Sequence, residues 1–352
     1  MKQLRNHVIR AGLGALYLTG AHHLLRPIFA GVGAIFMLHH VRPRPEGEFQ
    51  PNRHLEVAPE FLRAMLSHLR SRGIDIVTMD ELHRRLTERD FSRRFACFTF
   101  DDGYRNNREF ALPVMREFAA PFTVYVATDF AQGVGHLWWI ALEMVIARAS
   151  AVEAAIDGVA IRLDTSTPAA KQAAFDRLHD WLRALPGRQD LAREIGALCA
   201  SHGVDEAAIC RELCLSFDEL KPFADDPLVG IGAHSITHCN LASQPAEVAG
   251  EEMATSRKRI EDALQRPVVH LAYPYGDRLA AGRREFALAK TAGFNTAVTT
   301  RPGMLFPESA EHLTALPRVS LNGNYQDERI LPVLTSGAAT AMWNGFRRVD
   351  AA

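Results

Sequence analysis

The sequence has no excess of either charge: 40 Lys and Arg residues face 41 Asp and Glu residues, and the net charge is −1. Nucleic-acid-binding proteins present a basic surface, so this balance predicts no nucleic-acid partner. Cysteine is scarce, and the five cysteines have no paired spacing. This argues against a disulfide framework and favours a reducing compartment. Internal repeats and low-complexity tracts are also missing, so we expect one globular domain whose ligand is small or uncharged.

The apolar run at residues 11–18 is too short to span a bilayer, although it follows Arg5 and Arg10 and superficially resembles a secretory signal. Leu13, Leu16, Tyr17 and Leu24 suit one face of an amphipathic helix that packs on the protein or lies on a membrane surface. We therefore predict an uncleaved helical segment at residues 1–30, with an export segment as the alternative. The expected location is the cytoplasm or the periphery of the inner membrane, with peripheral membrane contact through this segment.

Apolar runs alternate with helical patterns along most of the chain, and the 47% hydrophobic content supports a large core. This alternation predicts an α/β fold, a (β/α)7-8 barrel over residues 31–330, with its site at the carboxyl ends of the strands. Residues 131–226 interrupt the pattern with helix-rich sequence and are predicted to be an insertion, and residues 331–352 a C-terminal tail. The candidate strands are residues 33–38, 74–78, 96–100, 122–126, 228–231, 268–272, 294–298 and 315–319.

The first polar strand end is Asp101-Asp102-Gly103, which follows the apolar run at residues 97–100. Side chains alternate faces along a strand, so neighbouring aspartates serve one cavity only where the strand stops and the backbone turns. Gly103 permits such a turn. In isolation, an Asp pair that merely caps the next helix is the simpler interpretation.

The second polar strand end holds His234 and His238, which follow the apolar run at residues 228–231. At a spacing of four residues the two imidazoles share a face of a helix and bind one divalent metal, with an Asp from another strand as third ligand. Each motif alone is a weak signal, because histidines at this spacing are usually surface residues. Their conjunction at two strand ends predicts a metal site.

A third strand ends in residues 272–276, with the sequence Ala-Tyr-Pro-Tyr-Gly. Proline directs the chain there, and a following amide is a ready oxyanion donor, although a plain turn is the simpler interpretation. Taken with residues 99–103 and 234–238, this motif resembles the polysaccharide deacetylases, carbohydrate esterase family four, which include the nodulation-type chitooligosaccharide deacetylases. The resemblance spans residues 30–320 apart from the insertion. It implies a distorted (β/α) barrel and metal-assisted removal of N-acetyl groups from the amino sugars of an oligo- or polysaccharide.

The resemblance also implies a role for each motif residue. Asp101 becomes the general base, and Asp102, His234 and His238 become ligands of a divalent metal, most commonly Zn²⁺, with Co²⁺ or Ni²⁺ as alternatives. The backbone amide of Tyr275 becomes the oxyanion donor. This division suits amide hydrolysis, which needs a polarised carbonyl, an activated water and a group that accepts the proton of that water.

The sequence departs from the family pattern in two places. Ala272 stands where the third motif usually has an arginine that orients the base, and Arg318, at the end of the last predicted strand, is the candidate replacement. The late Leu-x-His motif that carries the general acid is not evident, since His312 lies outside a convincing strand. Residues 37–41 instead resemble the Met-Tyr-His element of circularly permuted members. We therefore predict His39 as general acid, on the wall of the barrel mouth opposite Asp101, with His40 on the other face.

Two other functions stay open from the sequence. The missing arginine favours a catalytically weakened glycan-binding barrel that keeps its metal. Nothing in the sequence excludes a barrel that hydrolyses a non-sugar amide. Release of acetate from a chito-oligosaccharide, abolished by a chelator and restored by zinc or cobalt, would separate the deacetylase from the binding protein.

Overall fold

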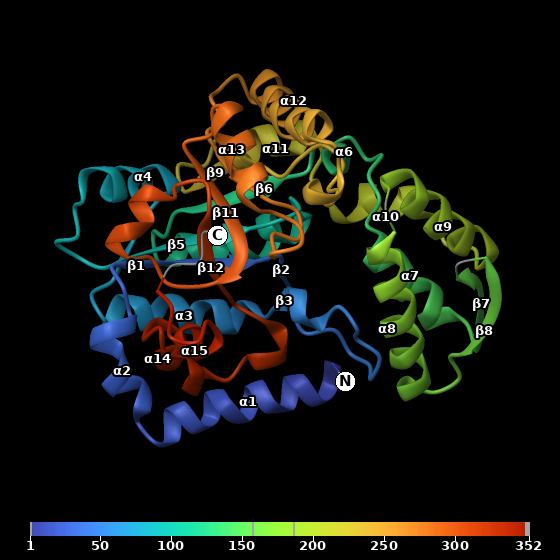
Figure 1. The fold of residues 1–352 in the computed structure, drawn as a ribbon, viewed down its shortest axis with the longest axis horizontal. Helices are drawn as coiled ribbons and strands as arrows, with labels where there is room; N and C mark the ends of the chain where they lie inside the picture. Colours follow the sequence, from blue (N-terminus) through green and yellow to red (C-terminus); the bar gives the residue numbers. More distant parts are fainter. Residues whose placement is uncertain (1, 157, 186, 349–352) are drawn as a thin grey trace.

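A parallel β-barrel forms the centre of the computed structural model, which describes residues 2–156, 158–185 and 187–348 (Figure 1). Seven strands form a closed ring, because β1 pairs with both β12 and β5. The short strand β4 lies outside this ring and pairs with the first two residues of β5. The predicted (β/α) barrel is therefore confirmed: seven of the eight predicted strands form the ring, and the one predicted at residues 74–78, β4, lies beside it. The strands are β1 (Gly33–Leu38), β4 (Asp75–Ile76), β5 (Phe95–Phe100), β6 (Phe122–Val126), β9 (Val229–Ala233), β10 (His270–Ala272), β11 (Thr296–Pro302) and β12 (Leu316–Ser320).

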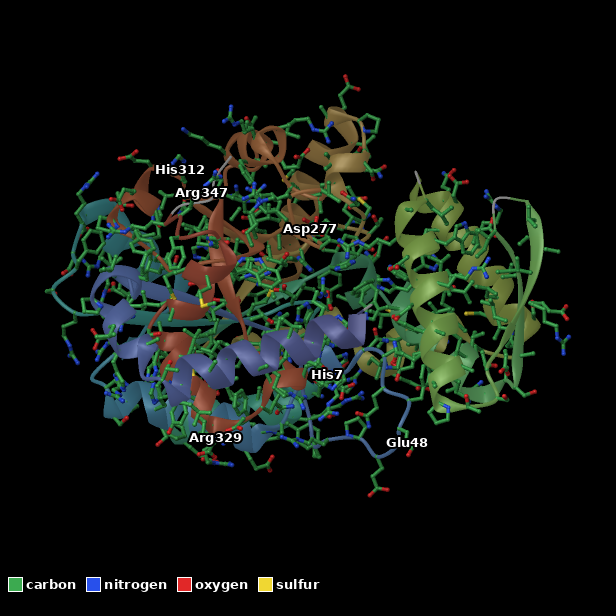
Figure 2. The ribbon with its side chains drawn as sticks, turned by 60° about the horizontal axis from the view of Figure 1, so that its bottom comes forward. His7, Glu48, Asp277, His312, Arg329 and Arg347 are labelled. Carbon is green, nitrogen blue, oxygen red and sulfur yellow. The ribbon has the colours of Figure 1, made fainter. Side chains whose placement is uncertain are left out.

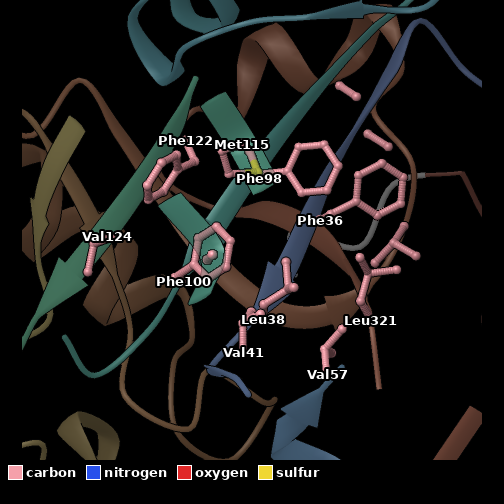
Figure 3. Packing of buried hydrophobic residues seen from close by; sticks show 14 of the residues in the cluster. Phe36, Leu38, Val41, Val57, Phe98, Phe100, Met115, Phe122, Val124 and Leu321 are labelled. Carbon is pink, nitrogen blue, oxygen red and sulfur yellow. The ribbon is translucent and has the colours of Figure 1, made fainter. Parts of the chain in front are cut away.

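The central strands are continuously apolar because both of their faces are buried. Alternate residues face the two sides: Phe98 and Phe100 belong to one apolar cluster, where Figure 3 shows them among Phe36, Met115 and Phe122, whereas Cys97 belongs to another. This period of two places Asp101 on the same side as Cys97, at the carboxyl end of β5. The alternation along β5 thus directs Asp101, the first of the two aspartates, toward the interior of the barrel at its mouth.

Helices surround the barrel, and their apolar faces are buried against the strands. The longest, α12, buries a stripe that includes Met253 and Ile260. The barrel helices are α3 (Pro59–Ser71), α4 (Met79–Glu88), α5 (Leu112–Glu117), α12 (Ala246–Leu264) and α13 (Arg283–Thr291). Shorter elements are β2 (His40–Val41), β3 (Glu56–Val57), η1 (Arg53–Leu55), η2 (Asn107–Ala111), η3 (Leu241–Ser243), η4 (Pro307–Glu311), η5 (Gly323–Tyr325) and η6 (Glu328–Ile330).

The segment between β6 and β9 projects from one side of the barrel (Figure 1) and has a core of its own that includes Leu142, Phe175 and Leu178. It contains α6 (Thr128–Ala131), α7 (Trp138–Arg148), β7 (Ala151–Ile156), β8 (Val159–Asp164), α8 (Pro168–Ala184), α9 (Arg188–Ser201), α10 (Glu206–Leu213) and α11 (Phe217–Ala224). The antiparallel hairpin of β7 and β8 was not predicted, because alanine and glutamate in β7 have low strand propensity. Val152 is fully buried in the local core and anchors the hairpin.

Two helices precede the barrel, α1 (Lys2–Leu18) and α2 (Ala21–Phe29), and α14 (Leu331–Thr335) and α15 (Ala338–Trp343) follow it. The predicted single apolar stripe is wrong in part. Leu13 and Leu16 are buried, but the chain turns at Gly20, which has a φ of 70°, and Leu24 lies exposed on the second helix. None of the helices in the described residues combines the length and apolar character needed to cross a membrane.

Candidate active site

Asp101 and Asp102 reach one site because the backbone turns between them. The amide of Asp101 still donates to the Leu38 carbonyl at 3.0 Å, which continues the pairing of β5 with β1. Asp102 then adopts a φ of 73° and Gly103 a φ of 70°, so the chain leaves the strand in the left-handed region. Both carboxylates are buried, and the turn lies at Gly103, where the sequence predicted it.

Arg318 forms a two-pronged ion pair with Asp101. Its Nη1 and Nη2 lie 2.7 Å from Oδ1 and Oδ2, and its Nε donates to the Thr299 carbonyl at 2.8 Å. Burial raises the pKa of Asp101, but the charge and hydrogen bonds of Arg318 outweigh this effect and hold that pKa below its usual value. Asp101 is therefore a carboxylate at neutral pH. The guanidinium that the third motif lacks at Ala272 thus comes from β12.

Asp102, His234 and His238 form a compact group of metal-ligand type. The Nε2 atoms of His234 and His238 lie 3.4 and 3.3 Å from Asp102 Oδ1, an oxygen that is buried without a hydrogen-bond partner. Two ligands bound about 2.1 Å from one Zn²⁺ in tetrahedral geometry lie about 3.4 Å apart, so the spacing fits such an ion.

The hydrogen bonds of His234 orient it for metal binding. Its Nδ1 lies 2.7 Å from the Ala272 carbonyl and donates to it, which leaves Nε2 with its lone pair toward Asp102. Burial raises the pKa of Asp102, but the neighbouring imidazoles of His234 and His238 outweigh this effect and hold that pKa well below its usual value. The group therefore offers an anionic oxygen and an imidazole nitrogen of defined orientation, which is a donor set that suits a divalent transition metal.

The two histidines do not lie on a helix, contrary to the prediction. Residues 234–238 form a loop in which Ser235 and His238 have φ values of 62° and 58°. The Ser235 hydroxyl accepts from the His238 amide at 3.0 Å, and this turn still brings the two imidazole rings within 4.9 Å of each other. These left-handed conformations are incompatible with a right-handed helix, and the amides of Ile236 and Thr237 are bonded to a side chain.

That side chain is Glu252 of α12, a residue that the sequence analysis missed. Its Oε2 accepts from the amides of Ile236 and Thr237 at 2.8 and 2.9 Å, and its Oε1 accepts from the Thr237 hydroxyl at 2.8 Å. Glu252 is buried beside Met253, within the apolar stripe of α12. An acidic residue in such a stripe needs partners, and this was the signal that could have revealed it.

Left-handed backbone is concentrated at the site. Asp102, Ser235, His238 and Tyr275 are four of the eight non-glycine residues with positive φ in the described chain, and they lie in all three motifs. Each such conformation costs about 1–3 kcal/mol and persists only where the surrounding contacts impose it. The three loops are therefore held in strained conformations around one point.

His39 follows β1 and lies beside Asp101, not on the opposite wall as predicted. Because β1 pairs with β5 as well as with β12, Leu38 is level with Phe100 and the next residues are neighbours. His39 Nε2 lies 3.8 Å from Asp101 Oδ2, and its side chain is 18% exposed. Burial lowers the pKa of His39, although the carboxylate of Asp101 opposes this effect.

His40 faces away from the Asp101 pair, as predicted. Its ring stacks on Tyr104 with 3.6 Å between centroids, and its Nδ1 accepts from Asn106 Nδ2 at 2.8 Å. Burial lowers the pKa of His40 to about 3, so it is neutral at physiological pH. His312, whose side chain is exposed, follows η4 and has no place in the constellation just described.

The third motif turns at Tyr275, which has a φ of 59°, and two residues of the insertion contact its ring. Trp138 Nε1 donates to the Tyr275 hydroxyl at 3.0 Å, and the Arg183 guanidinium lies 5.1 Å from the ring centroid. A cavity of about 310 Å³ opens here, between the insertion and the loop that carries His238. The insertion therefore forms one wall of the space beside the metal-ligand group.

Residues 199–297 match the polysaccharide deacetylase family model, a range that includes the second and third motifs. This segment of the chain is similar to the polysaccharide deacetylases. The match excludes the Asp101-Asp102 pair, which the insertion separates from the other motifs in the sequence. No curated protein matches the sequence.

Solved polysaccharide deacetylases share the fold. The deacetylase PplD of Streptococcus pyogenes, in complex with acetate, has a TM-score of 0.56 and 16% identity, over 84% of this chain and 95% of that one. IcaB from Ammonifex degensii has a TM-score of 0.53 and 16% identity, over 87% and 96% of the two chains. A polysaccharide deacetylase from Bacillus cereus has a TM-score of 0.53 and 18% identity, over 86% and 68%. At these identities the likeness establishes the barrel fold.

Proposed function

We propose that this protein is a metal-dependent hydrolase that removes N-acetyl groups from amino-sugar units of an oligo- or polysaccharide. The observation that carries the proposal is the division of the two adjacent aspartates between different partners. Asp101 is paired with Arg318, whereas Asp102 faces His234 and His238. One carboxylate is thus available as a base and the other as a ligand, which are the two tasks that hydrolytic deacetylation requires.

Asp102, His234 and His238 would hold the metal. A divalent ion in this position would polarise the acetyl carbonyl and lower the pKa of the attacking water. The unpartnered Oδ1 of Asp102 and the orientation of His234 support this assignment. Zn²⁺ is our first choice because imidazole and carboxylate ligands suit it, and Co²⁺ and Ni²⁺ are alternatives that accept the same donors.

Asp101 accepts the proton of the attacking water in this mechanism. Arg318 keeps the carboxylate ionised and fixes both of its oxygens through two parallel hydrogen bonds. Removal of the guanidinium would leave a buried carboxylate whose pKa rises through desolvation, and the base would then be protonated. Arg318 is therefore a positioning residue that acts through Asp101.

His39 carries the proton to the departing sugar amine. Its Nε2 lies 3.8 Å from Asp101 Oδ2, and its side chain is partly open to solvent. Burial lowers the pKa of His39, so its neutral form dominates at pH 7. The proton that it delivers is then the one taken from water through Asp101, and the hydrolysis balances: water supplies the acetate oxygen and the amine proton.

The backbone amide of Tyr275 serves as the oxyanion donor. Trp138 and Arg183 support the loop from the insertion by contacting the Tyr275 ring. The cavity beside His238 is bordered by Trp138 and Tyr275, and aromatic rings of this kind suit the apolar face of a sugar. These contacts, the match of residues 199–297 to the polysaccharide deacetylase model and the fold shared with a solved polysaccharide deacetylase support an N-acetylated saccharide as substrate.

A glycan-binding barrel without activity is the second candidate, and the missing arginine was the feature that favoured it. The pairing of Arg318 with Asp101 removes that argument, because the base has its guanidinium partner after all. A non-sugar amide as substrate remains a separate outcome of the assay.

Acetate release from chito-oligosaccharides tests the proposal. We expect release by the protein loaded with zinc, loss of activity after treatment with a chelator, and recovery when zinc or cobalt is returned. A matched Asp101→Asn variant controls for contaminating activity. Glycan binding without acetate release by the zinc-loaded protein would favour the binding barrel, and release from a simple acetanilide alone would favour a non-sugar amide.

A further inference from the structure

Large apolar side chains are exposed mainly where the two ends of the described chain meet. In the described residues, eight of the twelve exposed large apolar side chains belong to α1, α2 and the segment around α15, and the other four are scattered over separate elements. α15 packs against both α1 and α2, and the rings of Phe29 and Phe346 lie 5.7 Å apart. The terminal surface, as we name it, consists of Val8, Ala11, Ala15, Leu18, Leu24, Ile28, Met342, Trp343 and Phe346.

The outer face of α1 carries an apolar stripe beside the exposed His7 and Arg10. Val8, Ala11, Ala15 and Leu18 follow one another at intervals of three or four residues and are all exposed, whereas Leu13 on the opposite side is buried. Figure 2, which turns the lower edge of Figure 1 forward, shows α1 lying across the front of the molecule. An exposed apolar stripe of this kind favours binding to an apolar partner, because the removal of apolar surface from water lowers the free energy.

The second helix continues this surface. Leu24 and Ile28 are one helical turn apart on α2, and Leu24 is 80% exposed. Trp343 at the end of α15 is exposed as well, and tryptophan is enriched at the boundary between lipid and water because its ring is apolar and its N–H is polar.

Charge is segregated around the terminal surface. Residues 1–45 and 330–348 contain no acidic residue, so every Asp and Glu of the chain except Asp350 lies between residues 46 and 329. Both terminal segments carry arginines, among them Arg5, Arg26 and Arg347. A nearly neutral protein thus presents one apolar face whose own elements carry only positive charge.

A basic cavity adjoins the same face. It has a volume of about 420 Å³ and is lined by Leu18 of the terminal surface, by Tyr17, and by Arg10, Arg44 and Arg53. Asp327 also lines it and is paired there with Arg329. Arg10 donates to the Asn324 carbonyl at 2.8 Å, which anchors α1 to the η5 segment. Guanidinium groups in a concave site beside apolar side chains match a phosphate next to an acyl chain.

We propose that the terminal surface docks the protein onto a bilayer that contains anionic phospholipids, with α1 and α2 lying in the interface. Short apolar side chains and flanking arginines are what an interfacial helix needs: the apolar stripe enters the acyl boundary while the guanidinium groups contact phosphates. This surface is built from elements other than those of the candidate active site.

Sedimentation with vesicles tests the proposal on the whole chain. Vesicles would contain either phosphatidylcholine alone or phosphatidylcholine with about a quarter phosphatidylglycerol. We expect the unaltered protein to sediment with the anionic vesicles and to stay in solution with the neutral ones. Leu18→Asp/Leu24→Asp should weaken binding at least about tenfold, since it places charge on the apolar stripe, and Arg5→Glu/Arg347→Glu should weaken it by at least about fivefold.

Matched controls separate docking from unfolding and from activity. Val159→Asp alters an exposed apolar residue on β8 and should bind vesicles as the unaltered protein does. All variants should keep the melting temperature within a few degrees and the turnover of a soluble oligosaccharide. Equal binding by Leu18→Asp/Leu24→Asp, or no binding of the unaltered protein to anionic vesicles, would overturn the proposal. So would a dimer in sedimentation velocity that this variant dissociates, because a second copy would then cover the surface.

Discussion

Arg318 provides the sharpest test of the proposed chemistry, because its guanidinium makes a buried pair with a single carboxylate. The side chain is fully buried, and both of its contacts with Asp101 are 2.7 Å long. Arg318→Met removes the charge at similar length and leaves the Asp101 carboxylate buried alone. Breaking a buried pair in this way costs about 3–5 kcal/mol of folding free energy, a large share of the roughly 5–15 kcal/mol that stabilises a typical domain.

The catalytic effect of Arg318→Met has the same origin. Without the guanidinium, desolvation raises the pKa of Asp101, and the protonated acid no longer accepts a proton from water. We expect turnover to fall about a hundred- to ten-thousand-fold, as in other losses of a general base. Arg318→Lys keeps the charge but not the two parallel hydrogen bonds, so it should lose less stability than Arg318→Met and still lose most activity.

A double-mutant cycle separates the pair from its parts. Chemical unfolding would be measured for the unaltered protein, Arg318→Met, Asp101→Asn and the double variant, together with zinc content and acetate release. We expect the double variant to be more stable than Arg318→Met, because it leaves no unpaired buried charge. Near-normal turnover of zinc-loaded Arg318→Met, or additive losses of stability in the cycle, would refute the reasoning.

Four further predictions follow from the site and the fold. His238→Ala should abolish stoichiometric zinc binding and keep the melting temperature within a few degrees, and full zinc occupancy measured by elemental analysis would contradict its assignment as a ligand. Asp101→Asn should retain zinc and lose about a hundred- to ten-thousand-fold in acetate release, so loss of zinc as well would mean that both aspartates are ligands. His39→Ala should lower kcat about a hundred-fold or more without releasing zinc. If His40→Ala has this effect and His39→Ala does not, the general acid is His40 and our assignment is wrong. His68→Gln should flatten the loss of stability between pH 6.5 and 4: burial lowers the pKa of His68 to about 4 in the folded state, so the unfolded chain takes up the proton first as pH falls. The difference in unfolding free energy should reach on the order of 1 kcal/mol at pH 4 after solvent screening, and parallel stability curves would count against it.

The sequence by itself determined the strands and their polar ends. Both faces of a barrel strand are buried, so each strand is a continuous apolar run that is readable without any partner. The point where such a run stops at Asp101, His234 or Tyr275 is equally local, and the carboxyl ends of parallel strands meet at one mouth. For this reason the metal-ligand group and the polysaccharide deacetylase resemblance were within reach of the residues alone.

Only the tertiary structure decided which strand ends are neighbours. His39 lies beside Asp101 because β1 pairs with β5, and Arg318 reaches Asp101 across 217 positions of sequence. Residues 234–238 form a loop whose amides are bonded to the carboxylate of Glu252, whereas the local spacing predicted a helical turn. Pairing between distant strands and the burial of one acidic side chain depend on the closure of the barrel. Residue periodicity reports which face of an element is buried, and the identity of the neighbour across that face is set by the packing of the whole chain.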